Sequence, residues 1–175
     1  MSKRGIVMVN TGDGKGKSTA AFGLALRAAG HGKKVIIIQF MKGNTEYGEV
    51  QAVRKYLPMI RLEQTGTENF VDKYNPEEID IEEAQRGYAL GLEAVKSGEY
   101  DLVILDEINV AMDFDLISVE KVLALIESKA EKTDLMLTGR YASQSIKDVA
   151  DMVTEMGEVK HHFYAGFPAK PGIEY

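Results

Sequence analysis

Residues 5–30 contain an apolar segment, a glycine-rich turn and an alanine-rich segment in direct succession. This order of segments restricts the possible folds more than any other feature of the chain. The apolar segment GIVMV covers residues 5–9, the turn TGDGKGKST covers residues 11–19, and STAAFGLALRAA covers residues 18–29. A short uninterrupted apolar run favours a buried strand, and an Ala/Leu-rich segment that ends at glycine favours a helix. A strand that passes through a glycine turn into a helix is typical of α/β proteins.

Five further segments rich in apolar residues alternate with helical patterns along the chain. These segments, which we also predict to be strands, are residues 34–40, 60–64, 101–107, 134–139 and 151–156. Several of them are continuously apolar, as expected for parallel strands that are covered on both faces. We therefore expect residues 1–175 to form a single α/β domain, a three-layer sandwich around a mostly parallel central sheet.

Two further helices have recognisable start signals. Asp80 begins a capping-box pattern before a helix whose Ala84, Tyr88, Gly91 and Val95 share one face. Ser118 is the expected N-cap of another helix. The buried stripe that we expect on that helix consists of Val119, Val122, Leu123 and Ile126.

Two stretches lack helical or strand periodicity. Residues 65–79 are polar with two aromatic residues, and residues 157–175 contain glycines, prolines and four aromatic residues. We expect both to be long loops, with residues 157–175 forming an arm over the site or at a subunit interface, because long loops in compact domains are commonly functional.

Composition excludes several classes of function. A net charge of −6 argues against a nucleic-acid partner. The absence of cysteine rules out disulfides and Cys-ligated metal sites. The apolar run near the amino terminus is far shorter than a signal-peptide core or a membrane span, so we expect a cytoplasmic protein without membrane contact.

The glycine turn predicts a phosphate-binding site. Gly12, Gly14 and Gly16 let the backbone point its N–H groups inward at the positive end of the following helix. Lys17 adds a charge for phosphate oxygens, and the Ser18 hydroxyl can bind Mg²⁺. The common pattern G-x-x-x-x-G-K-[ST] would require glycine at Thr11, so this loop is one residue short.

Polar residues at the ends of other predicted strands complete this prediction. Asp106 and Glu107 follow the run LVIL, at a position that commonly orders Mg²⁺ next to such a loop. Arg140 follows a further strand and suits a polyphosphate, although a surface salt bridge is about as compatible with its position. No general base stands out. His161 and His162 are adjacent, a spacing poorly suited to joint binding of one metal, so we expect satisfied or exposed histidines.

With these residues in place, the chain resembles the P-loop family of ATP:cob(I)alamin (corrinoid) adenosyltransferases. The resemblance covers nearly the whole chain. The motifs that carry it are TGDGKGKST (11–19), GLALRAAGHGKKV (23–35), QFMKG (39–43), LDEIN (105–109), LTGR (137–140), ADMVTEM (150–156), and VKHHF and GIEY in the tail. Members characteristically have this shortened loop and bind ATP in the reverse sense, so that the ribose C5′ is exposed to Co(I) and inorganic triphosphate leaves.

The resemblance implies the role of each site residue. Lys17 and Arg140 are expected to contact the triphosphate, Ser18 and Glu107 to hold Mg²⁺ with Asp106 in support, and Phe70, or else Tyr74, to exclude the lower cobalt ligand. The residues expected to bind the nucleotide or corrin are Gly12, Asp13, Gly14, Lys15, Gly16, Lys17, Ser18, Thr19, Gln39, Lys42 and Glu49. The resemblance also implies a homodimer. Because the chain has no thiol, an external flavoprotein-like reductant is expected to supply Co(I).

Two other functions are compatible with the residues alone. One is a nucleoside or small-molecule kinase, which would release ADP. The other is a non-catalytic ATP or corrinoid carrier. The choice between cobalamin and an incomplete corrinoid precursor as the substrate also stays open.

Overall fold

The computed structural model describes residues 4–175 and contains one six-stranded sheet within them. Every strand pair is parallel, and the strand order is β3-β2-β4-β5-β1-β6. The strands are β1 (Val7–Thr11), β2 (Val35–Phe40), β3 (Ile60–Thr65), β4 (Leu102–Asp106), β5 (Asp134–Thr138) and β6 (Met152–Glu155). All six predicted strands are confirmed, and the sheet is wholly parallel.

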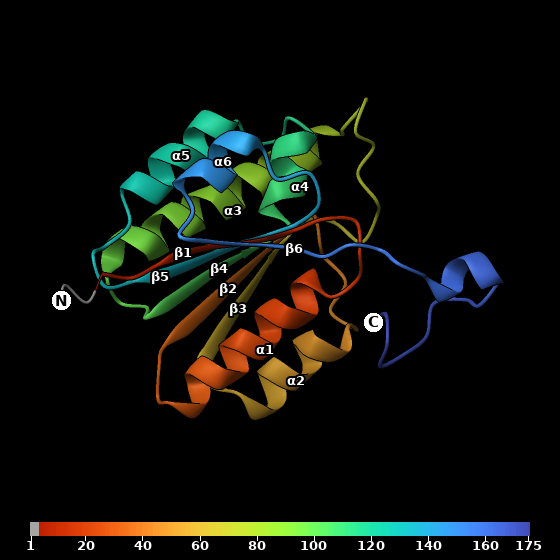
Figure 1. Cartoon of the computed structure of the whole chain (residues 1–175), viewed down its shortest axis with the longest axis horizontal. Coiled ribbons are helices and arrows are strands. Elements are labelled where there is room, and N and C mark those ends of the chain that lie inside the picture. Colours follow the sequence, from red (N-terminus) through yellow and green to blue (C-terminus); the bar gives the residue numbers. More distant parts are fainter. Residues whose placement is uncertain (1–3) are drawn as a thin grey trace.

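Helices cover both faces of the sheet and complete the predicted three layers (Figure 1). One face carries α1 (Lys17–Gly30) and α2 (Gly48–Tyr56). The other face carries α3 (Glu78–Ser97), α4 (Ile108–Asp113), α5 (Val119–Glu127) and α6 (Gln144–Val149). No helix within residues 4–175 is long and apolar enough to cross a membrane.

Successive residues of the central strands enter two different hydrophobic clusters. In β2, Ile36 and Ile38 pack on the side of α3, whereas Val35 and Ile37 pack on the side of α1. Side chains alternate between the faces of a strand, and both faces of this sheet are covered. This double burial explains why the strands are continuously apolar in the sequence.

Two helix starts can be compared with the sequence signals. The N-cap of α5 is Ser118, as predicted, and its hydroxyl accepts a hydrogen bond from the Lys121 amide. The prediction for α3 is wrong by three residues, because Glu77 is the N-cap and Asp80 is the acidic residue at the third helical position. Both hydrogen bonds of a capping box are formed: the Glu77 side chain accepts from the Asp80 amide, and the Asp80 side chain accepts from the Glu77 amide. The capping box therefore begins at Glu77 and not at Asp80.

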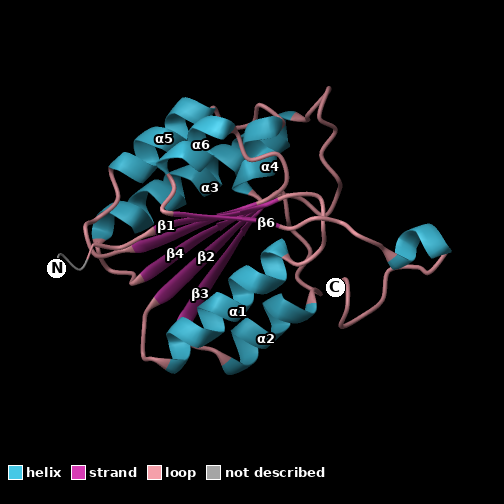
Figure 2. Cartoon of the chain, viewed as in Figure 1, coloured by secondary structure: helices cyan, strands magenta, loops and turns pink. Residues whose placement is uncertain are grey.

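The tail from Gly157 onward leaves the sheet after β6 and contains one short 3-10 helix, η1 (His162–Ala165) (Figure 2). It runs out beyond the carboxyl ends of the strands and then returns toward α1 and α2. The prediction of a long irregular segment at residues 157–175 agrees with this course. The loop at residues 66–77, before α3, lies at the same edge of the sheet.

The glycine at position 87 allows α3 to lie close to the sheet, and we predict that Gly87→Ala destabilises the protein. A Cβ at this position would lie 2.8 Å from Cε1 of Phe40, and Phe40 has no exposed surface. The expected loss in the free energy of unfolding is about 1–3 kcal/mol, because a packed core resists added volume. Urea denaturation measures this loss.

Gly23 provides the matched control for this substitution. It lies inside α1, and a Cβ there would meet nothing within 4 Å. Gly23→Ala should therefore stabilise the protein by about 0.5–1 kcal/mol, since alanine is the better helix former. If Gly87→Ala proved as stable as Gly23→Ala, the close packing of α3 would have no energetic importance.

Candidate active site

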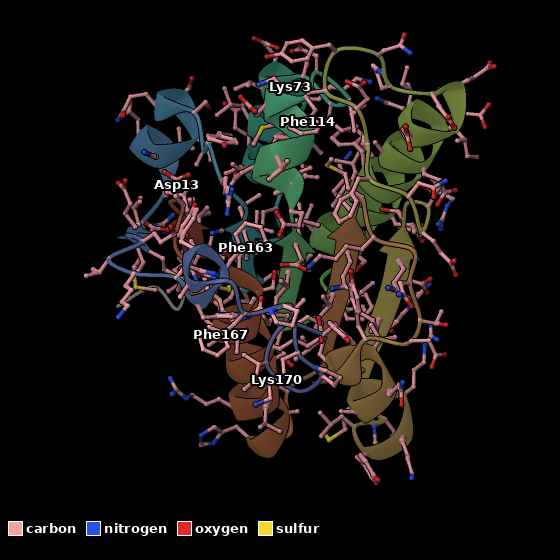
Figure 3. All side chains as sticks on the ribbon, turned by 90° about the vertical axis from the view of Figure 1, so that its right-hand side faces the viewer. Asp13, Lys73, Phe114, Phe163, Phe167 and Lys170 are labelled. Carbon is pink, nitrogen blue, oxygen red and sulfur yellow. The ribbon has the colours of Figure 1, made fainter. Side chains whose placement is uncertain are left out.

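The carboxyl ends of the strands surround a cavity of about 630 Å³. Its walls come from the glycine turn, the start of α2, the residues after β4 and β5, and the tail. Figure 3 faces this edge of the sheet, with Asp13 of the turn and Phe163 and Phe167 of the tail labelled. The volume lies within the range of small-molecule sites, and the position is where open α/β sheets bind ligands.

The glycine turn has the backbone geometry that its sequence predicts. Gly12 and Gly16 have positive φ angles of 94° and 118°, which side chains with a Cβ rarely adopt. Gly16 is also the N-cap of α1, and no side chain caps that end. The free N–H groups at the start of α1 therefore face the cavity as a site for an anion.

Lys17 is the first residue of α1, and its side chain folds back onto the turn. Its Nζ donates hydrogen bonds to the carbonyl oxygens of Gly12 and Gly14, each at 2.7 Å. Burial lowers the pKa of Lys17, and the negative charge of Glu107 opposes that shift. A positive charge is thus held at the centre of the turn, on the wall of the cavity.

A second lysine lies among the oxygen atoms that we expected to hold Mg²⁺. Lys42 Nζ lies 2.8 Å from Asp106 Oδ2, 3.2 Å from Ser18 Oγ and 3.9 Å from Glu107 Oε1. The structure therefore brings together the three predicted metal ligands around one cation. Sequence reasoning placed Lys42 near the substrates but did not predict this arrangement.

Asp106 and Glu107 have different environments although they are neighbours. Asp106 has no exposed surface, and Thr138, Gln39 and Lys42 donate hydrogen bonds to its two oxygens. Burial alone would raise the pKa of Asp106, but Lys42 and these hydrogen bonds hold it below its usual value. Burial, followed by the charge of Asp106, raises the pKa of Glu107, which lines the cavity.

The backbone turns sharply at the ends of three strands next to the cavity. Met41 after β2, Glu107 after β4 and Tyr141 after β5 are non-glycine residues with φ angles of 57°, 66° and 61°. Such left-handed residues cost about 1–3 kcal/mol each and cluster at functional sites. At Glu107 this conformation lets its N–H donate to Thr138 Oγ1 at 3.0 Å.

The remaining predicted residues divide into cavity walls and supporting positions. Arg140 and Glu49 line the cavity, together with Asp13, Lys15 and Thr19 of the turn. Glu49 lies in the first turn of α2. Gln39 is fully buried in β2, in register with Asp106, so it reaches the site only through that carboxylate. Gln39 does not line the cavity, so its contact with the nucleotide or corrin stays a prediction.

Phe70 and Tyr74 lie in the loop at residues 66–77, and both side chains are almost completely exposed. Neither residue lines the cavity. Lys73, between them, donates to Asp113 at 2.7 Å, and its Nζ lies 5.6 Å from the centre of the Phe114 ring. Figure 3 shows Lys73 beside Phe114 at the top of this edge.

Two contributions to the site come from residues that the sequence analysis did not single out. Thr138 links Asp106 to the backbone of Glu107, and the only signal was a polar residue at the end of the apolar run DLML. Ile173, Glu174 and Tyr175 return to line the cavity, and Glu174 pairs with Lys15 at 3.2 Å. We expected residues 157–175 to form an arm over the site or at a subunit interface, but we predicted no role for these three residues.

Comparison with known proteins assigns a family to this arrangement. The sequence model of the ATP:corrinoid adenosyltransferase family BtuR/CobO/CobP matches residues 3–175. Three relatives named corrinoid adenosyltransferase, from Sinorhizobium sp, Pseudomonas aeruginosa and Salmonella typhimurium, are each 36% identical to this chain. Each alignment covers 99% of the chain, and it covers 81%, 85% and 87% of the three relatives in that order.

Proposed function

The chain belongs to the ATP:corrinoid adenosyltransferase family, and from this premise we propose how its residues carry out the reaction. The enzyme transfers the 5′-deoxyadenosyl group of ATP to the Co(I) of a reduced corrinoid. The cobalt electron pair forms the Co–C5′ bond, the C5′–O5′ bond breaks, and its electron pair leaves with inorganic triphosphate. The observation that carries this function is the family match along the whole chain, and neither the kinase nor the carrier alternative has comparable support.

The protein's task in this reaction is to position the reactants and to stabilise charge on the leaving group. Co(I) has no proton to lose, so no general base is needed. We assign the triphosphate to the turn at residues 12–19, where backbone N–H groups at the start of α1, Lys17 and Arg140 face one cavity. Fixed donors of this kind stabilise developing negative charge without reorganisation.

A Mg²⁺ ion fits the oxygen atoms around Lys42. Ser18 supplies a hydroxyl, Glu107 supplies a carboxylate on the cavity wall, and the buried Asp106 supports the group from behind. The ammonium of Lys42 lies among these oxygens, which indicates that they favour a cation. Bound Mg²⁺ would neutralise part of the triphosphate charge, with Ser18 and Glu107 as its ligands.

We predict that Lys42 competes with this metal. In Lys42→Met, the affinity of the nucleotide-free protein for Mn²⁺, a spectroscopic substitute for Mg²⁺, should rise by roughly five- to thirtyfold, since a nearby positive charge is removed. Titration followed by electron paramagnetic resonance measures this affinity. The metal should also restore thermal stability to the variant, in which Asp106 has lost its charged partner.

Lys73→Met is the control for that measurement, because Lys73 pairs with Asp113 outside the cavity. Its Mn²⁺ affinity should equal that of the unmodified protein. A fall in Mn²⁺ affinity in Lys42→Met would mean that Lys42 assists metal binding, and the competition would be disproved.

We propose that the corrin is bound next to the loop at residues 66–77, with Phe70 against its lower face. The ring of Phe70 is fully exposed, so ordinary packing does not account for it. Lys73 anchors this loop to α4 through Asp113 and so limits where Phe70 can lie. Tyr74 is the alternative, with a similar exposure.

Further features of the function are proposals from the family and the composition. The chain contains no cysteine, so an external reductant, flavoprotein-like in our proposal, would supply the electrons for Co(I). We also propose a homodimer and a cytoplasmic location. We treat residues 1–175 as one domain in which residues 157–175 serve as an arm over the site, since parts of that segment line the cavity.

An anaerobic assay tests the function directly. MgATP and chemically reduced cob(I)alamin are mixed with the protein, the visible spectrum reports adenosylcobalamin, and the phosphate products are separated. We expect more than one turnover, with one triphosphate per adenosylcobalamin. ADP and phosphate without a cobalt–carbon product would refute the transferase function, and a single turnover would indicate a carrier.

A further inference from the structure

A cluster of possible metal ligands lies in the tail, apart from the oxygen atoms around Lys42. His161, His162 and Glu174 each offer one ligand atom, and these atoms lie within 4.8 Å of one another; within residues 4–175 this is the only such group. The two imidazole rings are stacked, with centroids 4.6 Å apart and planes inclined by 23°. Their adjacency in sequence is poorly suited to joint binding of one metal, but the extended backbone at His161 and the start of η1 at His162 bring the rings together.

Glu174 has one carboxylate oxygen without a hydrogen-bond partner. Its Oε2 accepts a hydrogen bond from Lys15 at 3.2 Å. Its Oε1 is buried and has no hydrogen-bond partner, and it lies 3.6 Å from His162 Nε2. A buried polar atom without a partner is uncommon in proteins and points to a missing ligand.

The geometry and chemistry of the cluster suit a divalent transition metal. In a tetrahedral zinc site, bonds of about 2.0–2.2 Å place the ligand atoms roughly 3.3 Å apart, so His162 and Glu174 need to move very little. His161 must give up the hydrogen bond that its Nδ1 accepts from the Phe163 amide at 3.2 Å, or turn its ring. That bond is exposed, so water can accept from the Phe163 amide in place of His161 at small cost.

A second cavity, of about 220 Å³, lies beside the cluster and would leave a fourth coordination position open. His161, His162 and Glu174 line it together with Arg140 and Tyr164. Two imidazoles and a carboxylate with one open position are a common zinc ligand set. We propose that His161, His162 and Glu174 form a binding site for Zn²⁺ or a divalent cation of similar chemistry.

Such a site would join two parts of the tail across the mouth of the nucleotide cavity. His161 precedes η1, whereas Glu174 lies beside Ile173 and Tyr175, which line that cavity. Glu174 also contacts Lys15 of the glycine turn. A cation bound here would therefore close the tail into a ring next to the turn, independently of the Mg²⁺ that we propose for Ser18 and Glu107.

Zinc titration of the untagged, metal-free chain tests this proposal. The titration is followed by calorimetry in millimolar Mg²⁺ and without nucleotide, because Mg²⁺ prefers oxygen ligands and fills the other metal site. We expect one equivalent of Zn²⁺ to bind, and Co²⁺ at the same site should give visible absorption bands typical of low coordination. In His162→Ala and Glu174→Gln, the affinity should fall at least about tenfold.

His31→Ala is the matched control, because His31 lies in the exposed turn after α1. This variant should bind Zn²⁺ normally, and circular dichroism should show that all variants are folded. Lys15→Met should bind Zn²⁺ more tightly, since its ammonium repels the cation and competes for Glu174. The proposal is overturned if one equivalent does not bind at micromolar concentrations, or if His162→Ala and Glu174→Gln bind like the unmodified chain.

Discussion

Replacement of Lys17 by methionine is expected to lower the rate of adenosyl transfer by about 10²–10³-fold. The ammonium of Lys17 is held by the carbonyl oxygens of Gly12 and Gly14 and faces the cavity in which we place the triphosphate. Charge develops on the leaving oxygen as the C5′–O5′ bond breaks, so the loss should appear mainly in kcat. The anaerobic assay, with initial rates over a range of ATP concentrations, measures it.

Lys33→Met controls for the loss of one positive charge. Lys33 is largely exposed and pairs with Asp101 near the amino ends of the strands, away from the cavity. Its activity should equal that of the unmodified enzyme. If Lys17→Met kept more than about a tenth of the activity, stabilisation of the leaving group would have to come from other donors, such as Arg140.

Replacement of Gly12 by alanine is expected to cost at least about 2 kcal/mol in the free energy of unfolding and to abolish ATP binding. The φ angle of 94° alone costs an L-residue about 1–2 kcal/mol. In addition, a Cβ at Gly12 would lie 2.5 Å from the carbonyl oxygen of Met156, a backbone atom that cannot turn away. The turn must then separate from the end of β6. Urea denaturation and calorimetric ATP titration measure the two effects.

Gly32→Ala separates backbone strain from crowding. Gly32 also has a positive φ, of 72°, but a Cβ there would meet nothing within 4 Å, and the residue lies after α1, outside the cavity. This variant should lose about 1–2 kcal/mol and bind ATP normally. If Gly12→Ala lost no more stability than Gly32→Ala and still bound ATP, the close contact between the turn and the end of β6 would not be required for the conformation that binds ATP.

The sequence was sufficient to predict the fold because its local signals agree with one another. Uninterrupted apolar runs such as KVIIIQF arise from strands that are buried on both faces, and all six were recognised. The start of α3 was misplaced because Glu77 and Asp80 are both acidic and either can open a capping box. The helix α2 was not predicted, since only Val50 and Val53 of its nine residues are buried.

Those site residues that belong to a local sequence motif could be predicted. Lys17, Ser18 and Glu107 line one cavity, as the strand–turn–helix pattern indicates. The position of Lys42 among the oxygens of Ser18, Asp106 and Glu107 could not be predicted, because it depends on the left-handed turn at Met41. The return of Glu174 to Lys15 spans 159 residues and left no local pattern in the sequence.

Because β1 lies between β5 and β6, we expect the nucleotide site to form late during folding. The Val7 amide donates to Asp151, 144 residues away, and the Gly14 amide donates to the Met156 carbonyl. The phosphate turn is therefore encoded near residue 12 but completed by backbone near residue 156. During synthesis, β2, β3 and β4 can pair early, whereas β1 must wait for partners from far downstream, and pairing over such separations is slow. We therefore expect the emerging chain to acquire a structural framework before it acquires the ability to hold ATP.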